Sequence, residues 1–287
     1  MNDSLTLHLS SEGDPIRQLA DQVMILATEA QEVFAERYGA YAWRADLSEP
    51  AVFWFEREPP AIFRPSFVGS VSGYSNTWLW GWENINGYPD AVVDLASRTR
   101  AVGEQVGSVE LTTAQLPLDA DARKADGLAE REAPPHDYVL AAMAVSGLRA
   151  PVFYRAPTGD DSYAWFVLDN PEEFDLPAPS VLQLATLIPR LLQAGLLDDH
   201  RLAVRAYATR RPGLSIVEDG ETVTLTAPDG ALTATFDELG RLTNLSVRAA
   251  ASQAAPEREP VSRTETEPKA RGLFSRRRRG KENPDRP

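Results

Sequence analysis

Four segments rich in aromatic and β-branched residues follow one another between residues 42 and 83, with only short turns between them. The segments are Ala42–Leu47, Ala51–Glu56, Ala61–Val71 and Thr77–Glu83. Residues of these types favour strands. Short connections permit only antiparallel neighbours, because parallel strands need a long crossover. The region is therefore predicted to fold as an antiparallel meander.

A long helix is predicted in front of this meander, over Asp14–Tyr38. Asp14 can cap the free amides of the first turn, and Pro15 suits the first helical position. Apolar residues then recur at steps of three and four, which places them along one face of the helix. Gly39 ends the pattern. The helix is amphipathic and needs a partner surface.

Helices and strands continue after the meander up to about residue 170. The predicted elements are a helix between Pro89 and Gly107, a strand over Val109–Leu116, helices over Asp119–Arg131 and Asp137–Gly147, and a hairpin of Pro151–Arg155 and Ser162–Leu168. Because helices and strands are grouped and do not alternate regularly, we predict an α+β fold on an antiparallel sheet, packed by the N-terminal helix and further helices.

A second group of elements follows a proline-rich linker. It consists of a helix over Ser180–Leu197, which Pro189 should kink or split, a helix over Asp198–Arg210, and strands over Leu214–Val217, Thr222–Ala227, Leu232–Phe236 and Leu242–Val247. Asp-Gly turns join the strands into a small four-stranded meander. We predict a main domain over 1–170, a helix-plus-meander subdomain over 179–248 and a disordered arginine-rich tail over 249–287. An extension of the main fold is the alternative to a separate subdomain.

Charge is unevenly distributed along the 287 residues. The chain has 29 basic and 42 acidic residues, and the segment from Ala249 onward holds ten and six of them, which leaves a net charge of −17 on residues 1–248. An acidic body repels nucleic acid and anionic lipid. The tail has the opposite character. Arg276, Arg277, Arg278, Arg279 and Lys281 follow Leu273 and Phe274, a pattern that permits weak contact with an anionic membrane, contact with nucleic acid, contact with the acidic body, or no function.

The segment Thr77–Asn84 is the densest candidate binding site. On a strand, alternate side chains share a face, so Trp78, Trp80 and Trp82 would stand side by side. As a ligand site, the three indoles form an aromatic platform for a sugar, a base or another planar molecule, with Glu83 and Asn84 adding polar contacts at its end. As core, the same indoles form the floor on which the N-terminal helix packs.

These residues also carry a resemblance to a known family. The stretch Phe67–Ser72, followed by Trp78, Leu79, Trp80, Trp82 and Asn84, resembles a widespread, uncharacterised bacterial domain family. Its members have a tryptophan-rich strand after a glycine- and serine-containing strand, and a long helix before both. The likeness spans about residues 19–168. It implies a domain boundary and no activity, because the family has none established.

The sequence lacks the patterns of the common catalytic and cofactor sites. It contains no cysteine, which excludes disulfides and thiolate metal sites and fits a reducing cytoplasm. The sequence predicts no signal peptide and no membrane-spanning run. It contains no phosphate-binding glycine loop, nucleophile elbow or metal-binding histidine pair. We therefore predict no cofactor and no metal.

The function remains unknown from the sequence, and three readings compete. The first is a non-catalytic, soluble cytoplasmic binding or interaction protein with a possible protein partner. The second is an enzyme of unrecognised class, with Glu83, Asn84 and His136 in one pocket. The third is a membrane-surface adaptor that acts through the basic tail.

Overall fold

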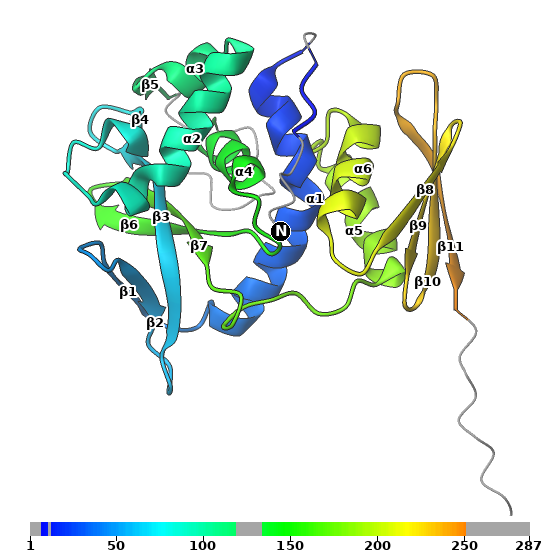
Figure 1. Cartoon of the computed structure of the whole chain (residues 1–287), viewed down its shortest axis with the longest axis horizontal. Helices are drawn as coiled ribbons and strands as arrows, with labels where there is room; N and C mark the ends of the chain where they lie inside the picture. Colours follow the sequence, from blue (N-terminus) through cyan, green and yellow to red (C-terminus); the bar gives the residue numbers. More distant parts are fainter. Residues whose placement is uncertain (1–6, 11–12, 119–133, 251–287) are drawn as a thin grey trace, which may run out of the picture. The chain divides into compact units, whose positions relative to one another are not determined.

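One long helix is the central element of the structure. The computed structural model describes residues 7–10, 13–118 and 134–250. Helix α1 (Pro15–Tyr38) begins at Asp14, whose side chain accepts a hydrogen bond from the Ile16 amide at 2.9 Å, as the sequence predicts. The sequence predicts that one face of this helix is buried, but in the structure every residue from 19 to 30 is buried. The helix is therefore enclosed by other elements and does not lie on the surface (Figure 1).

An antiparallel sheet lies on one side of α1. Its strands in the described residues are β1 (Trp43–Asp46), β2 (Val52–Phe55), β3 (Ala61–Ser72), β4 (Thr77–Trp80), β5 (Gln115–Pro117), β6 (Val152–Gly159) and β7 (Ser162–Asp169). The long strand β3 pairs with β2, β4 and β7, so it organises the sheet. The predicted meander is confirmed as β1 to β4, and the predicted hairpin as β6 and β7. The α+β class is confirmed.

The helices that pack with this sheet follow two of the predicted ranges and correct a third. Helices α2 (Asp90–Val106) and α4 (Pro134–Ser146) lie where the sequence places them. The predicted strand Val109–Leu116 is wrong in its first half, which is the helical turn α3 (Val109–Thr112). The Ser108 hydroxyl accepts from the Leu111 amide at 3.4 Å and caps this turn. A local cap thus outweighs the strand preference of the β-branched residues.

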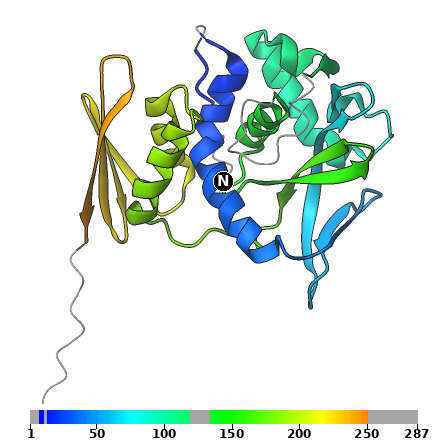
Figure 2. The ribbon, with the colours of Figure 1, turned by 180° about the vertical axis from the view of Figure 1, so that it is seen from behind.

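A smaller group of elements lies on the other side of α1 (Figure 2). It contains α5 (Val181–Gln193), α6 (His200–Arg210) and the four-stranded meander β8 (Ser215–Asp219), β9 (Thr222–Ala227), β10 (Gly230–Phe236) and β11 (Leu242–Ala249). The predicted meander is confirmed, with strand order β11-β10-β9-β8. The helix predicted over Ser180–Leu197 is not split at Pro189, because α5 is a single helix with this proline inside it.

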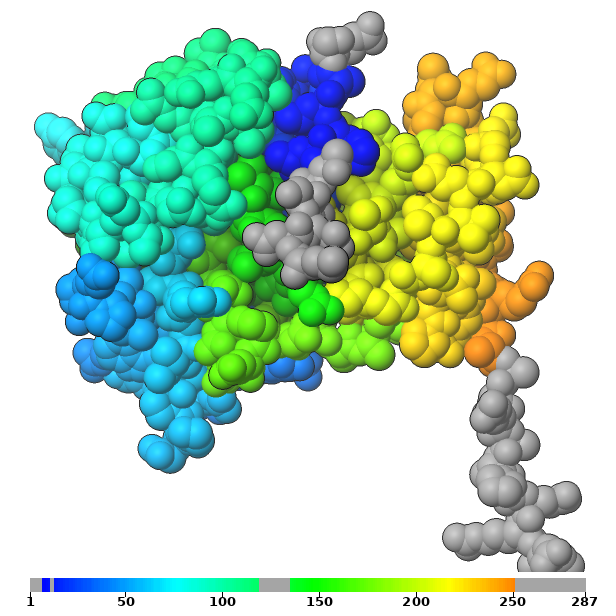
Figure 3. Space-filling view, viewed as in Figure 1, coloured from blue at the N-terminus to red at the C-terminus, as the bar shows by residue number. Residues whose placement is uncertain are grey.

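The two groups share the buried helix between them. Glu29 of α1 is 2% exposed and accepts two hydrogen bonds from the guanidinium of Arg211, at 2.9 and 3.0 Å, just after α6. The Tyr207 hydroxyl donates to the same carboxylate at 2.8 Å. Residues Met1–Ala250 form one compact unit, and in Figure 3 the surfaces of α1 and α6 adjoin. The division into domains 1–170 and 179–248 stays an interpretation of the sequence, and no break in packing accompanies it.

Two predicted segments lie outside the described residues. These are the helix over Asp119–Arg131 and the tail over 249–287, apart from its first two residues. In the part of the chain that the structure describes, no helix is both long enough and apolar enough to cross a membrane.

Candidate functional site

The first two tryptophans of the predicted platform lie inside the core. Trp78 and Trp80 share one face of β4, as the alternation predicts, and are 0% and 1% exposed. Their rings meet edge to face at 5.4 Å, and each contacts the ring of Tyr138 in α4, at 5.5 and 5.4 Å. The core interpretation therefore describes these two rings, and the helix whose aromatic side chain contacts both of them is α4.

The third tryptophan does not share their face, because β4 ends at Trp80. Residues Gly81–Glu83 form a short 3-10 helix, and Asn84 ends it in the left-handed conformation, with φ of 46°. Trp82 is half-buried under the guanidinium of Arg100, which lies 4.4 Å from the ring centroid. The row of three indoles predicted from the sequence is thus wrong, because it requires an extended backbone through Trp82.

The two polar residues of the predicted site have different surroundings. Asn84 holds its own turn closed, since its side chain accepts from the Tyr88 amide at 2.8 Å and donates to the Tyr88 carbonyl at 2.9 Å. Glu83 is exposed to solvent. A ligand platform needs exposed ring faces, so the burial of Trp78 and Trp80 does not support a platform on this strand.

Gly69 explains how the Trp78 ring fits between the strands. It lies on β3 directly opposite Trp80 of β4. A Cβ atom at this position would meet an atom of the Trp78 indole at 2.4 Å and the Leu79 carbonyl oxygen at 2.6 Å. Real Cβ atoms do not approach other heavy atoms so closely, so the glycine in the tryptophan-rich segment leaves the space that the indole fills.

Burial of Tyr138 and Tyr38 predicts a loss of stability in alkaline solution. Burial, followed by the charges of Glu110 and Asp137, raises the pKa of Tyr138 to about 12, and burial with the Glu173 hydrogen bond raises that of Tyr38 to about 12. The ordinary value in the unfolded chain is 10.0. Between these two values Tyr38 and Tyr138 ionise only in the unfolded state. Their contribution to the free energy of unfolding is therefore fully present below pH 10 and is lost as the pH rises toward 12.

Urea unfolding measured from pH 8 to pH 11 checks this prediction. The free energy of unfolding is expected to decline from pH 10 upward, and more gently in Tyr138→Phe, which lacks one of the ionising groups. A decline of equal steepness in that variant would remove Tyr138 from the explanation.

His136, the third residue of the enzyme reading, is enclosed by aromatic rings. It is 2% exposed, and its ring meets those of Trp165 and Phe153 edge-on, at 5.0 and 5.9 Å. Neither His136 nor Glu83 nor Asn84 is among the residues that line the cavities described below. The enzyme interpretation, in which these three residues share one pocket, stays a prediction.

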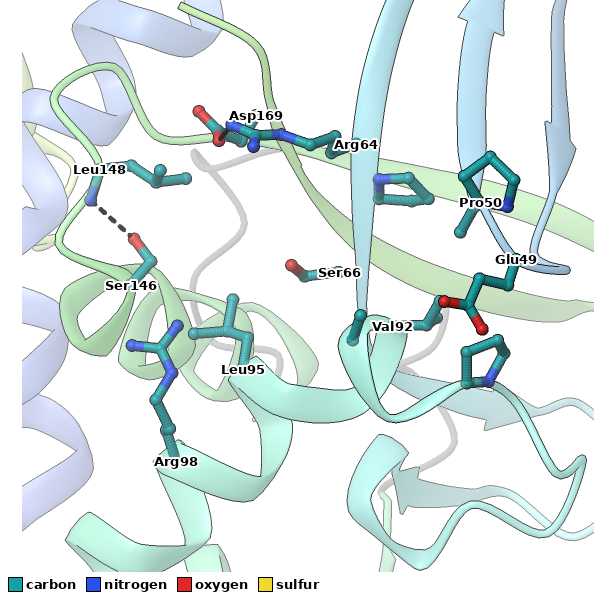
Figure 4. A pocket seen from close by; sticks show the side chains of 14 residues that line it. Glu49, Pro50, Arg64, Ser66, Val92, Leu95, Arg98, Ser146, Leu148 and Asp169 are labelled. Atoms are coloured by element: carbon teal, nitrogen blue, oxygen red, sulfur yellow. Dashed lines mark hydrogen bonds and ion pairs between the residues drawn. The ribbon is translucent and has the colours of Figure 1, made fainter.

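A cleft beside β3 is the better candidate for a small-molecule site (Figure 4). We call it the β3–α2 cleft; its volume is about 440 Å³. It is lined by Glu49, Pro50, Ala51, Arg64, Pro65, Ser66, Pro89, Ala91, Val92, Leu95, Arg98, Ser146, Leu148 and Asp169. Ligand sites commonly combine such a volume with an apolar lining and a few polar groups.

The polar groups of the β3–α2 cleft come from several elements and include two carboxylates, of Glu49 and Asp169, beside two guanidinium groups. Arg64 of β3 pairs with Asp169 at the end of β7. Arg98 of α2 bonds to Asp94 at 2.9 Å and to the Val145 carbonyl at 3.1 Å. In Figure 4 these two guanidinium groups lie on different sides of the Ser66 hydroxyl, which makes no hydrogen bond to any residue that the structure describes.

The strand pattern and the helix pattern together produce this cleft. Arg64 and Ser66 alternate along β3 with the inward-facing Phe63, so they point to the opposite face of the sheet. Val92 and Leu95 of α2 are buried beside them and form the apolar floor. Arg64, Ser66 and Arg98 are not among the site residues predicted from the sequence. The alternation of polar and apolar residues along β3 indicates that Arg64 and Ser66 share one face of the sheet. The sequence gives no indication that α2 packs beside that face.

The candidate tail residues Arg276, Arg277, Arg278, Arg279 and Lys281 lie outside the described residues. Their contact with an anionic membrane stays a prediction. Within the described ranges, the structure contains no group of three or more histidine, aspartate or glutamate side chains that could hold a metal ion.

Comparison with known proteins adds a family and no activity. A family model described as a family of unknown function (DUF6882) matches residues 17–171, which is more than half of the chain. No curated protein and no solved structure matches. The match covers α1 from residue 17 onward and the seven-stranded sheet, and all residues that line the β3–α2 cleft fall within it. Helices α5 and α6 and the meander β8 to β11 lie beyond it.

Proposed function

We propose a function for this chain, which belongs to the family of unknown function DUF6882, from the chemistry of the β3–α2 cleft. In this proposal the protein is a non-catalytic binding protein. Its ligand is a small organic anion with an apolar body. The cysteine-free sequence supports a cytoplasmic location for this activity.

The observation that carries the proposal is the pairing of an apolar floor with two guanidinium groups at the mouth. The floor, formed by Val92, Leu95 and Leu148 with three prolines, favours an aliphatic or aromatic body by removing its surface from water. Arg64 is largely exposed and Arg98 about half exposed, so each can exchange its present carboxylate for one on a ligand. A guanidinium binds a planar carboxylate through two parallel hydrogen bonds.

The hydroxyl groups of the cleft support binding and not catalysis. Ser146 donates to the Met143 carbonyl at 2.7 Å and accepts from the Leu148 amide at 3.1 Å, so it closes the end of α4. Ser66 has no histidine or carboxylate within hydrogen-bond distance among the described residues. A serine nucleophile needs an adjacent base, and neither hydroxyl has one here.

A thermal-shift screen with small carboxylates tests the proposal. We expect carboxylates with an aliphatic or aromatic body to raise the Tm of the wild-type protein, because a ligand that binds only the folded state stabilises it. The same compounds are expected to lose most of this effect on Arg64→Ala/Arg98→Ala. These two arginines form exposed ion pairs, whose removal costs only about 0–1 kcal/mol each, so the variant stays folded.

Arg44→Ala is the matched control. Arg44 on β1 also forms an exposed ion pair, with Glu56, and lies outside the cleft. Its variant is expected to keep the full ligand-dependent rise in Tm. Equal responses from all three proteins, or no response from the wild type across the screen, would remove the β3–α2 cleft as the binding site.

A further inference from the structure

A short extended segment lies along the N-terminal half of α1. We call Leu7–Ser10 the N-terminal strap; Figures 1 and 2 both draw it beside this helix. Its backbone is held by two glutamine side chains. Gln22 accepts from the His8 amide at 2.9 Å and donates to the His8 carbonyl at 2.8 Å. Gln18 accepts from the Ser10 amide at 2.7 Å and donates to the Ser10 carbonyl at 3.4 Å.

The spacing of the two glutamines matches that of an extended chain. Residues four apart on a helix have Cβ atoms about 5–6 Å apart, and alternate residues of a strand repeat every 6.6–6.8 Å or so. Each side-chain amide offers one donor and one acceptor, the same pair that a neighbouring strand would offer. We call Gln18 and Gln22 the glutamine rail. Because all four of these hydrogen bonds go to backbone groups of the strap, the rail can hold other extended segments in the same way, as strand addition does.

The same device occurs once more on α1, where its occupant is a strand. Gln31 accepts from the Phe153 amide and donates to the Phe153 carbonyl, both at 3.1 Å, at the edge of β6. Glutamine side chains of α1 thus substitute for a neighbouring strand at two places. At Gln31 the occupant is part of the sheet. At the glutamine rail the occupant is a four-residue segment outside both sheets.

The side chains of the strap alternate between two environments. Leu7 and Leu9 are half-buried against the core, whereas His8 and Ser10 are exposed. His8 lines a cavity of about 620 Å³ between the start of α1 and the start of α6. Its carboxylates come from Asp14, Asp21, Asp198 and Asp199, and its one guanidinium comes from Arg17.

This cavity is built from buried as well as exposed groups, and its charge favours a cation. Asp21 is 1% exposed and accepts from the amides of Asp198 and Asp199, at 3.2 and 2.8 Å. Arg17 lies 3.5 and 3.9 Å from carboxylate oxygens of Asp137 and Asp198. His8 forms no ion pair with the described residues. Four carboxylates and one guanidinium therefore line the cavity beside His8, and this charge balance favours a basic side chain at the His8 position.

We propose that the glutamine rail is an exchangeable binding site for an extended segment of a partner protein, with the pattern apolar, basic, apolar, small. The strap is the resident occupant, which the partner displaces. The two apolar side chains take the places of Leu7 and Leu9, and the lysine or arginine between them enters the acidic cavity in place of His8. Neither the strap nor Asp198 and Asp199 lies within the segment that the family model matches.

The test uses the full chain and a peptide added in solution. The probe is a fluorescein-labelled peptide with the sequence of residues 4–11, in which lysine replaces His8. In the variant His8→Pro/Ser10→Pro the strap has lost both of its donated hydrogen bonds, because proline has no N–H. We expect the probe to bind this variant at least about tenfold more tightly than the wild type, since a weaker competitor occupies the rail.

Three comparisons make the result specific. Adding Gln18→Met/Gln22→Met to the strap variant is expected to abolish binding of the probe. Adding Gln31→Met is expected to leave this binding unchanged. Circular dichroism checks that each variant is folded. The peptide with the native histidine is expected to bind more weakly than the lysine peptide at pH 7.4. This difference in affinity is expected to shrink in high salt. Failure of the probe to bind the strap variant, or binding that survives the loss of both rail amides, overturns the proposal. Equal binding of the two peptides overturns the basic preference.

Discussion

Replacing Glu29 by alanine is expected to lower the free energy of unfolding by about 3–5 kcal/mol, because it leaves a charged guanidinium buried without its partner. Arg211 is 4% exposed and directs two hydrogen bonds at this carboxylate. The Tyr207 hydroxyl loses its acceptor in the same change. Urea unfolding followed by circular dichroism measures the effect, which would be among the largest for any single ion pair of the described residues.

Glu32→Ala is the matched control, since it lies one turn further along α1 and pairs with Arg190 of α5 at the surface. Exposed pairs contribute about 0–1 kcal/mol, so this variant should unfold almost as the wild type does. The joint change Glu29→Leu/Arg211→Met is expected to recover part of the loss, because no charge is then left buried. Equal effects of Glu29→Ala and Glu32→Ala would contradict the burial of the Glu29 pair.

Trp78→Ala is expected to cost about 3–5 kcal/mol of stability, as removal of a fully buried indole from a core does. The ring contacts Trp80 and Tyr138 and fills the space that the missing Cβ atom of Gly69 leaves. Chemical unfolding with tryptophan fluorescence as the signal measures the change.

Trp82→Ala provides the comparison for this prediction. Trp82 is half-buried and contacts Arg100, so its removal should cost about 1–2 kcal/mol. A ligand platform would show the opposite behaviour, with small effects on stability at all three tryptophans and a loss of binding. The two variants together therefore separate the core role of β4 from a binding role.

Local patterns were sufficient to predict most of the elements. Asp14, Pro15 and Gly39 define both ends of α1, and the Asp-Gly turns define the meander after α6. Prediction failed where a short-range hydrogen bond decides the backbone. The Ser108 cap turns residues 109–112 into a helix, and the left-handed Asn84 ends the 3-10 turn that rotates Trp82 away from its neighbours.

The candidate sites were harder to predict because each depends on contacts between distant segments. The β3–α2 cleft combines Arg64, Arg98 and Asp169, which meet only after β3, α2 and β7 have packed. The glutamine rail joins residues 8 and 22 through backbone groups, for which the sequence offers no motif. The tryptophan-rich segment was predicted as a candidate binding site because it is the densest group of aromatic residues. The same alternate spacing is equally typical of a buried strand.

The enclosed position of α1 has a consequence for the order in which the protein acquires its structure. Arg211 lies 182 positions after Glu29 in the chain, so during translation this carboxylate is made long before its guanidinium. Contacts of such separation form late, because a large loop must close before they contribute. At a ribosomal elongation rate of about 5–20 residues per second, α1 waits roughly ten to forty seconds for the last of its partners.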